Sequence, residues 1–326
     1  MRLRLKFLVG MSVLLTAGEV LAASPAVQDT RVALHERINL KNKSYTGHGV
    51  VVAVIDSGVD FDHPLIRENR WINKSEAQGL PGVDDDHNGF IDDIAGWNFL
   101  ESSSQQQDNL GHGTASAGVI SSKIGLARDA QIMDLQVTDS HGVTTWKAVV
   151  AAIKYALKRK AQIINISLSA DYGLMKQIQS QIPAEQFESA LFVISGGNSS
   201  RLLPDKNDID NVLFVGATTL TEPIFRRAYY SMYGSGIDIS APAGDTLGNV
   251  TLALNWKVTP YRNYNGTSSA APVVSGAAAL KLQQSPHLKP KELKALIMSS
   301  AAKYSFLDKE ILDGNVLNVD ALLQSK

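Results

Sequence analysis

The chain has 326 residues, of which 44% are hydrophobic and 19% charged, and its formal net charge is −1. This composition is that of a globular protein with a large core. The near-neutral charge argues against nucleic acid or an anionic membrane as a partner. Two basic groups, at 158–160 and 226–227, are interpreted as a solvated helix end and a loop. The chain contains no cysteine, so its stability must come from core packing or a bound metal rather than from disulfides.

The N-terminus has the pattern of a secretory signal peptide. Arg2, Arg4 and Lys6 precede the apolar run FLVGMSVLLTAG, and the small residues of EVLAAS follow it. An uncleaved anchor is the alternative, but a dozen apolar residues fall short of the roughly 20 that span a bilayer. We therefore expect residues 1–22 to be a cleaved signal peptide and the mature protein to be soluble, either secreted or periplasmic. Residues 23–46 form a short N-terminal segment, and 47–326 form the main domain.

The mature chain alternates buried-strand and helical patterns. Five short β-rich runs are apolar on both faces, as strands inside a parallel sheet are: 50–56, 131–137, 163–169, 191–195 and 212–217. Helical spacing of apolar residues marks 144–160 and 289–301. In the first of these helices the stripe facing the sheet is expected to contain Trp146, Val149, Val150, Ile153, Ala156 and Leu157. The pattern predicts an α/β fold with a doubly wound, mostly parallel central sheet flanked by helices, and no second domain.

Three polar residues fall where such a sheet binds ligands, beyond the carboxyl ends of its strands. Asp56 ends the first strand, His112 stands between two glycines at a helix entrance, and Ser268 lies in the first turn of a small-residue helix. Alone, an Asp such as Asp56 is more often a turn or cap residue, and a His such as His112 a surface or satisfied core residue. Together they supply a nucleophile at a helix N-terminus, a base and an orienting acid. Pro272 is expected near the helix start, where its missing N–H costs little.

The segments around these residues, VAVIDSGVD, GHGTASAG and NGTSSAAPVVSG, resemble the three motifs of the subtilase family, the subtilisin-like serine proteases, in the order Asp, His, Ser. The resemblance implies the subtilisin-like fold, with Asp56 as orienting acid, His112 as general base and Ser268 as nucleophile. Asn198, in LFVISGGNSS, matches the family's side-chain oxyanion donor and would act with the Ser268 N–H.

The implied function is that of an exported serine endopeptidase that hydrolyses peptide bonds through an acyl-enzyme. A peptide ligase or cyclase, or a catalytically silent peptide-binding module, are the alternatives on the same scaffold. Its substrates would be proteins or peptides. The enzyme would be a monomer and would need no catalytic cofactor.

Relatives are often made with a folding-assistant segment. About two dozen residues separate the cleavage site from the first strand. We therefore expect the enzyme either to fold unaided or to receive an inhibitor or chaperone in trans.

The segment INISLS resembles the family's substrate-binding strand. Ser167 and Leu168 are thus expected to border the specificity pocket and to bind an extended peptide by strand addition. Ser169 stands where the family commonly has glycine, and its side chain would narrow this subsite.

A calcium site is predicted in residues 82–99, GVDDDHNGFIDDIAGWNF. Asp84, Asp86, Asn88, Asp92 and Asp93 resemble the start of an EF-hand-like loop, with oxygen ligands on alternate residues and a glycine at the turn. The expected bidentate glutamate is absent, since Ala95 occupies its place. The alternative is an acidic turn held by Asx hydrogen bonds. Because so many carboxylates repel one another without a cation, we expect a structural Ca²⁺.

Overall fold

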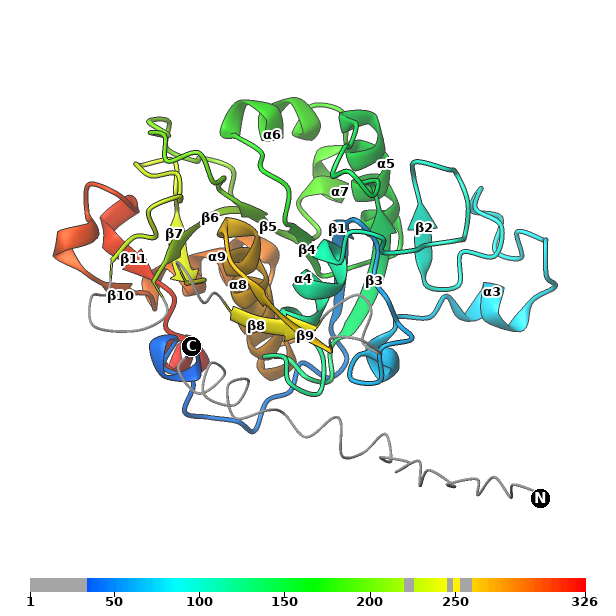
Figure 1. Ribbon diagram of the computed structural model, residues 1–326, viewed down its shortest axis with the longest axis horizontal. Helices are drawn as coiled ribbons and strands as arrows, with labels where there is room; N and C mark the ends of the chain where they lie inside the picture. The colour runs from blue at the N-terminus through cyan, green and yellow to red at the C-terminus, as the bar shows by residue number, and fades with distance from the viewer. Residues whose placement is uncertain (1–33, 220–225, 245–248, 253–259) are drawn as a thin grey trace, which may run out of the picture.

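The computed structural model describes residues 34–219, 226–244, 249–252 and 260–326 (Figure 1). The predicted signal peptide, residues 1–22, lies outside the described residues. Residues 34–40 pack against the end of the domain, since the Val319 N–H donates to the Ile38 carbonyl at 2.7 Å and Ile38 is fully buried.

A mostly parallel sheet forms the centre of the domain, in the strand order β10-β11-β7-β6-β5-β4-β1-β3-β2, and β10–β11 is its one antiparallel pair within the described ranges. This confirms the predicted α/β fold. Its strands are β1 (Val51–Asp56), β2 (Gly96–Asn98), β3 (Gln131–Gln136), β4 (Ile163–Ile166), β5 (Leu191–Ser195), β6 (Val212–Thr218), β7 (Ile239–Pro242), β10 (Ala302–Lys303) and β11 (Asn315–Val316). The five predicted strands are β1, β3, β4, β5 and β6, and the four others are short.

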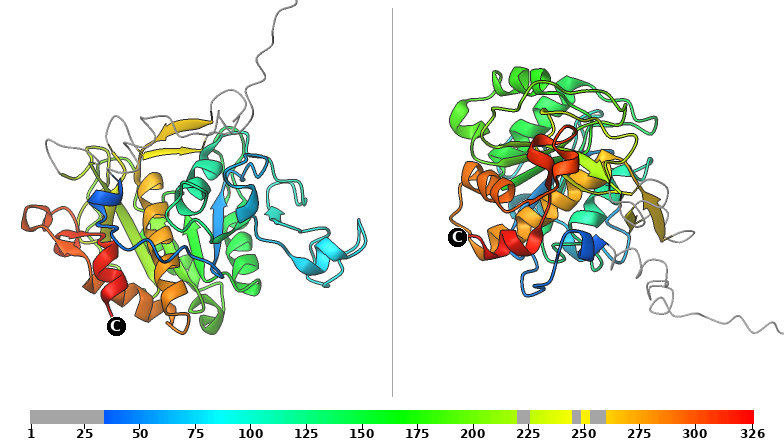
Figure 2. Two further views of the ribbon diagram at one scale, coloured as in Figure 1. Left: turned by 90° about the horizontal axis from the view of Figure 1, so that it is seen from below. Right: turned by 90° about the vertical axis from the view of Figure 1, so that its left-hand side faces the viewer.

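Helices cover both faces of the sheet (Figures 1 and 2). One face carries α4 (His112–Ile120), α8 (Thr267–Gln284) and α9 (Pro290–Ser299), and the other carries α5 (Trp146–Lys158), α6 (Tyr172–Gln179) and α7 (Ala184–Phe187). The short helix α10 (Val319–Gln324) packs against α8 in the first of these layers. The remaining elements are α3 (Lys74–Gln78) and the 3-10 turns η1 (Arg67–Asn69), η2 (Ser305–Leu307) and η3 (Leu312–Gly314). A hairpin of β8 (Asn249–Leu252) and β9 (Tyr261–Tyr264) runs beside α4 and α8.

The two hydrophobic cores follow from the alternation of side chains along each strand. Val52 and Val54 of β1 belong to the core under α4 and α8, whereas Ala53 and Ile55 belong to the core under α5. The predicted stripe of α5 is wrong at its start, because Trp146 is 39% exposed. The buried face begins at Ala148, since Trp146 is the first residue of the helix and precedes the turn that contacts the sheet.

Helix α8 passes through the middle of one core, where residues 267–282 are all buried. The small side chains in its first part, such as Ala270, Ala271 and Ala277, let neighbouring elements pack close to the helix axis. Gly276 shows the limit, since a Cβ atom there would lie 2.8 Å from the Cβ of Leu126.

The strand order places the candidate site. Strands β3 and β4 flank β1 on opposite sides, and the later strands extend the sheet beyond β4. The switch in winding direction therefore lies at the carboxyl ends of β1 and β4, where ligands bind in doubly wound sheets. Asp56 ends β1 and Ser167 follows β4 at this point.

The packing of α8 generates a stability prediction. The change Gly276→Val should lower the free energy of unfolding by about 1–3 kcal/mol, because the added methyl groups overpack the contact with Leu126. Urea unfolding measures the difference. Ala295→Val, at an exposed position of α9, is the matched control and should change stability by about 0.5 kcal/mol. An equal loss in both variants would contradict the tight contact.

Candidate active site

A buried carboxylate and an imidazole form the centre of the site. The Asp56 side chain is 1% exposed, and its Oδ1 lies 2.7 Å from Nδ1 of His112, the first residue of α4. The Ser57 N–H also donates to Oδ1 at 2.8 Å, and Ser116 Oγ donates to Oδ2 at 3.0 Å. These three donors stabilise the buried charge and hold the His112 ring in one orientation.

Glycines permit the approach of α4 to β1. Gly111 has φ +75°, and a Cβ at Gly113 would lie 2.1 Å from the Gly58 carbonyl oxygen. Any larger residue at position 113 would push His112 away from Asp56. The glycine that follows His112 in the sequence therefore permits a close backbone approach between α4 and the segment after β1.

Asp108 fastens the start of α4 and was not singled out from the sequence. Its Oδ1 accepts hydrogen bonds from Ser57 Oγ (2.8 Å) and the Gly111 N–H (2.7 Å), and its Oδ2 accepts from the Thr114 N–H (2.8 Å) and hydroxyl (2.6 Å). A capping side chain of this kind satisfies N–H groups that the first helical turn leaves free.

The pKa of His112 is raised above its usual value near 6.5. Burial alone would lower this pKa, but the charge of Asp56 and its hydrogen bond to Nδ1 favour the imidazolium and outweigh burial. Asp108 adds to the increase, while Arg262 opposes it.

Ser268 lies in the first turn of α8, close to the same centre. Its Oγ donates to the Ser167 carbonyl at 3.0 Å, and within the described ranges it makes no hydrogen bond to His112. The structure thus brings Asp56 and His112 into direct contact and links Ser268 to them through an intervening side chain.

That intervening side chain is Tyr264, at the end of β9. Its hydroxyl lies 3.1 Å from His112 Nε2, 2.9 Å from Ser116 Oγ and 3.0 Å from the Ser268 carbonyl oxygen. The two rings meet edge to face, with centroids 5.2 Å apart. Burial, with the nearby Asp56 charge, raises the pKa of Tyr264, so its hydroxyl remains protonated.

Pro272 explains why the Ser268 carbonyl accepts bonds from outside the helix. Residue 272 is four positions after Ser268, where an α-helix would supply the N–H partner, and proline has none. The Ser167 hydroxyl donates to it instead at 3.1 Å, and the Tyr264 hydroxyl lies 3.0 Å from the same oxygen. The expectation that Pro272 sits at the helix start is wrong: it lies inside α8, which begins at Thr267.

Asn198 is placed with its amide group next to the start of α8. Its Oδ1 accepts hydrogen bonds from the Thr267 N–H (2.9 Å) and hydroxyl (3.0 Å), which leaves Nδ2 free to donate. In the described part of the chain, neither Nδ2 nor the Ser268 N–H has a hydrogen-bond partner. Gly266 has φ +104°, and a Cβ atom at this position would lie only 3.0 Å from Asn198 Nδ2. Glycine therefore permits the close approach of this turn to the amide. Two unpaired donors near a serine can stabilise an oxyanion.

The predicted substrate strand continues past the end of β4. Ser167 is buried, Leu168 is half-buried and Ser169 is exposed. A Cβ at Gly197 would lie 2.6 Å from Met232 Sδ and 3.5 Å from Ser169 Oγ, so both side chains lie against the segment that carries Asn198.

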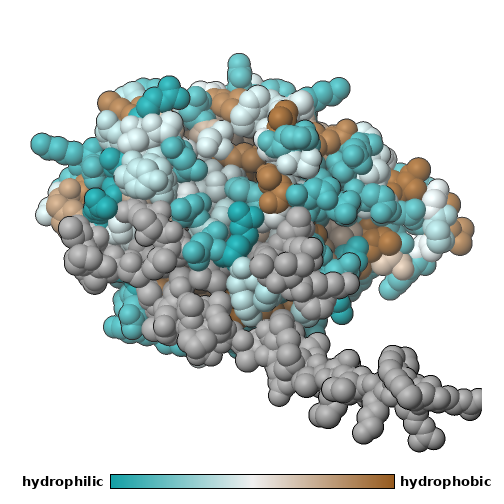
Figure 3. Space-filling view, viewed as in Figure 1, coloured by the Kyte–Doolittle hydropathy of each residue, from teal (hydrophilic) through white to brown (hydrophobic). Residues whose placement is uncertain are grey.

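Helix α3 and most of the predicted calcium loop, together residues 74–95, form an arm that extends from the body of the domain (Figure 1). Its exposed residues include Leu80, Val83 and Ile91, and apolar atoms mark this end of the molecule in Figure 3. Asp84 and Asp92 bind backbone: Asp84 accepts from the Asn88 and Gly89 N–H groups, and Asp92 accepts from the Gly82 N–H. The Asp84 bonds are local to the turn, as in the alternative to calcium, whereas Asp92 bonds a residue ten positions earlier.

Deeper in the arm, Asp86 and Asp93 meet Glu76. Each offers a carboxylate oxygen, and the three atoms lie within 4.8 Å of one another. Burial raises the pKa of Asp93, although hydrogen bonds from Tyr155 and Asn73 oppose this. The Asn88 amide also donates to Asp93 Oδ2, at 3.0 Å. Asp86 Oδ1 is buried without a hydrogen-bond partner. An unpaired oxygen beside two other carboxylates fits a hard cation.

Arg159 supplies a positive charge that sequence reasoning missed. Its Nη2 lies 2.6 Å from Asp86 Oδ2 and 3.2 Å from Asp93 Oδ2, and its side chain is only 17% exposed. The interpretation of residues 158–160 as a solvated helix end is therefore wrong for Arg159. Its partners are more than 60 residues away in sequence, so local patterns could not reveal them.

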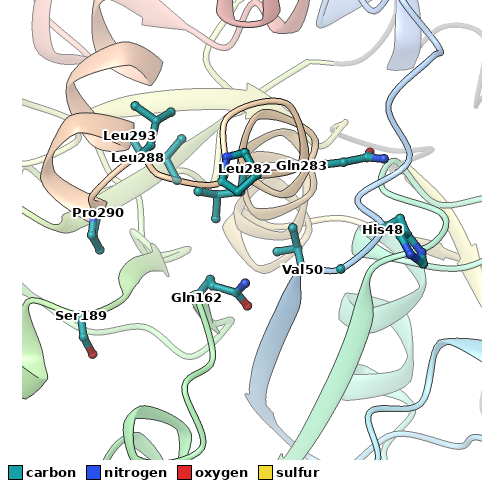
Figure 4. A pocket seen from close by; sticks show the side chains of 11 residues that line it. His48, Val50, Gln162, Ser189, Leu282, Gln283, Leu288, Pro290 and Leu293 are labelled. Atoms are coloured by element: carbon teal, nitrogen blue, oxygen red, sulfur yellow. The ribbon is translucent and has the colours of Figure 1, made fainter.

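A separate pocket of about 210 Å³ lies at the opposite, amino end of the strands (Figure 4). His48, Val50, Gln162 and Leu282 are among its lining residues. The Gln162 Oε1 already accepts a hydrogen bond from the Val51 N–H. The pocket brings no pair of titratable side chains together, so it is a poor candidate for chemistry.

Comparisons with known proteins agree with the sequence motifs. A family model described as the subtilase family matches residues 47–319. Subtilisin-like protease 1 of Plasmodium falciparum is 28% identical over 76% of this chain, but the match spans 39% of the Plasmodium protein. Thermitase of Thermoactinomyces vulgaris is 27% identical, and the match covers 79% of this chain and 83% of thermitase.

A solved structure is similar as well. The crystal structure of a cold-adapted subtilisin-like serine proteinase has a TM-score of 0.66 and 24% sequence identity, and the match covers 85% of this chain and 91% of that one. This likeness shows the subtilisin-like fold. With a family match over most of its length, the chain belongs to the subtilase family.

Proposed function

We propose that the protein is a serine endopeptidase. The observation that carries the proposal is the buried Asp56–His112 hydrogen bond of 2.7 Å next to the helix turn that presents Ser268. Subtilase membership supports it. The names of the relatives, among them proteases and thermitase, support it further.

In the proposed reaction Ser268 Oγ attacks the scissile carbonyl while His112 Nε2 takes its proton. Asp56 holds Nδ1–H and stabilises the imidazolium. Asn198 Nδ2 and the Ser268 N–H donate to the oxyanion that forms. The protonated His112 then gives its proton to the leaving amine, and water, activated in the same way, releases the acyl group from Ser268.

The substrate is proposed to be an extended peptide that lies along Ser167 and Leu168, with Ser169 narrowing the adjacent subsite. Export through the N-terminal segment is part of the proposal. No described helix is both long and apolar enough to cross a bilayer.

The test is a peptide-library digest with the purified protein and with Ser268→Ala. Loss of the nucleophile should reduce turnover by about a millionfold, since the triad acts as a unit, while circular dichroism remains that of the wild type. Mass spectrometry of the products separates hydrolysis from ligation or cyclisation. Equal cleavage by both proteins would remove Ser268 from the reaction, and no cleavage by either would favour a silent binding module.

The raised pKa of His112 predicts a pH dependence. The base must be neutral, so kcat/KM should fall with decreasing pH, with a midpoint above about 6.5. The contribution of His112 to the free energy of unfolding changes with pH in the opposite direction to activity. It is fully present below the pKa of histidine in the unfolded chain and is lost as pH rises through the pKa of His112 in the folded protein. NMR titration of His112 in Ser268→Ala measures the pKa directly. In Asp56→Asn the burial of His112 is no longer opposed by the carboxylate charge, so the pKa of His112 should fall below that of the parent. An unchanged pKa would contradict the role of Asp56.

We also propose that the arm binds a structural Ca²⁺ through Asp86 and Asp93, joined by Glu76. Three carboxylates and one guanidinium leave a formal charge of −2 in this cluster, which a divalent cation would neutralise. The unpaired Asp86 Oδ1 supports a ligand at this point. Asp84, Asn88 and Asp92 remain the ligands predicted from the loop pattern.

Calcium should therefore raise the melting temperature. At a hundredfold excess over its dissociation constant, a ligand bound only by the folded state stabilises it by about 2.7 kcal/mol. Melting curves of Ser268→Ala, which avoids autolysis, with calcium and with chelator measure the effect. Glu76→Gln should abolish the response and Asp84→Asn should retain it. The reverse result would favour the loop-pattern ligands, and identical curves in the parent would exclude the site.

A further inference from the structure

Both reactive atoms of the site are bound to groups other than each other. His112 Nε2 is bound to the Tyr264 hydroxyl at 3.1 Å, and Ser268 Oγ donates to the Ser167 carbonyl at 3.0 Å. Proton transfer from Ser268 requires Nε2 to accept from Oγ. The observed geometry is therefore a resting arrangement that must change before the reaction starts.

Counting protons shows that Tyr264 occupies Nε2 in either charge state of the base. With His112 neutral, Nδ1–H donates to Asp56, so Tyr264 donates to Nε2 and Ser167 Oγ donates to the Ser268 carbonyl. With His112 protonated, Nε2–H donates to the Tyr264 oxygen, and the tyrosine proton turns to the Ser268 carbonyl. Each hydroxyl has a hydrogen-bond partner in both cases, so the contact between Tyr264 and Nε2 persists when His112 gains or loses a proton.

The position of Tyr264 is fixed by more than one contact. The residue is buried, its ring packs edge to face on His112, and Ser116 Oγ contacts both its hydroxyl and Asp56. Its strand is tied to the loop before α4, since Arg262 donates to the Leu110 carbonyl at 3.4 Å. The hydroxyl thus belongs to the same network as the base and the orienting acid.

We propose that Tyr264 is a positioning residue that caps His112 in the resting enzyme and must release Nε2 before Ser268 can react. The proposal rests on the proposed function of Ser268 and His112. Substrate assists the release: an extended peptide whose N–H takes the Ser167 carbonyl frees Ser268 Oγ to turn toward Nε2. The cap therefore makes the serine slow toward small reagents that do not occupy the strand edge.

The test compares the rate at which a small phosphonofluoridate labels Ser268 in the wild type, Tyr264→Phe and Tyr261→Phe, at a pH where His112 is neutral. Phenylalanine keeps the ring contact and removes the hydroxyl. Labelling should accelerate about three- to tenfold in Tyr264→Phe, the factor that one net hydrogen bond corresponds to. Tyr261 is the matched control on the same strand, because its hydroxyl has no partner in the described part of the chain; Tyr261→Phe should label at the wild-type rate.

If Tyr264→Phe is labelled at the wild-type rate or more slowly, the proposal that Tyr264 caps His112 is wrong, while the proposed function stands. Failure of every folded protein to label would instead refute the function of Ser268. A second measurement covers the case in which Tyr264→Phe does not fold: the ¹⁵N shift of His112 Nε2 should be nearly the same in the wild type and Ser268→Ala, because Tyr264 is its partner. A large change between these two would show that Ser268 binds Nε2 and would also overturn the cap.

Discussion

The architecture around the candidate site depends on one buried negative charge. Asp56 lies in the core at the end of β1, where an unpaired carboxylate would be very unfavourable. Its oxygens are satisfied by the next residue of the chain, by His112 at the start of α4 and by Ser116 one turn later. The same helix can approach only because Gly113 has no side chain. Helix placement, ring orientation and the basicity of the imidazole thus have a common cause.

The acidic arm also contains carboxylates shielded from solvent, and here an arginine compensates part of their charge. Its buried carboxylates are met partly by Arg159 from the end of α5 and partly by Asn73 and Tyr155. A buried ion pair contributes little net stability, but removing one partner leaves an uncompensated charge. Arg159 therefore couples the folding of the arm to that of the central sheet, whether or not a cation is bound.

Much of this could be read from the sequence, because strand periodicity and the three motifs are local signals. The five central strands, the close glycine approach at His112 and the small-residue helix of Ser268 follow from residues adjacent in the chain. The contacts that were missed join distant segments: Glu76 with Asp86, Arg159 with Asp93, and Tyr264 with His112. The prediction that Trp146 is buried was wrong for a different reason. Periodicity shows which face of a helix is apolar but not the turn at which that face first contacts the sheet.

Proline inside α8 has a consequence for the motions of the protein. Because Pro272 cannot bond the Ser268 carbonyl, the first turn of this helix is held by Ser167 and Tyr264 from two other elements. Local opening of that turn is then governed by the segment after β4 and by β9 rather than by the rest of the helix. Amide hydrogen exchange should divide α8 into a fast segment that contains the unpaired Ser268 N–H and a slow segment beyond Gly276. Ser268 would thus lie on a small cooperative unit whose local opening is separate from that of the core beneath it.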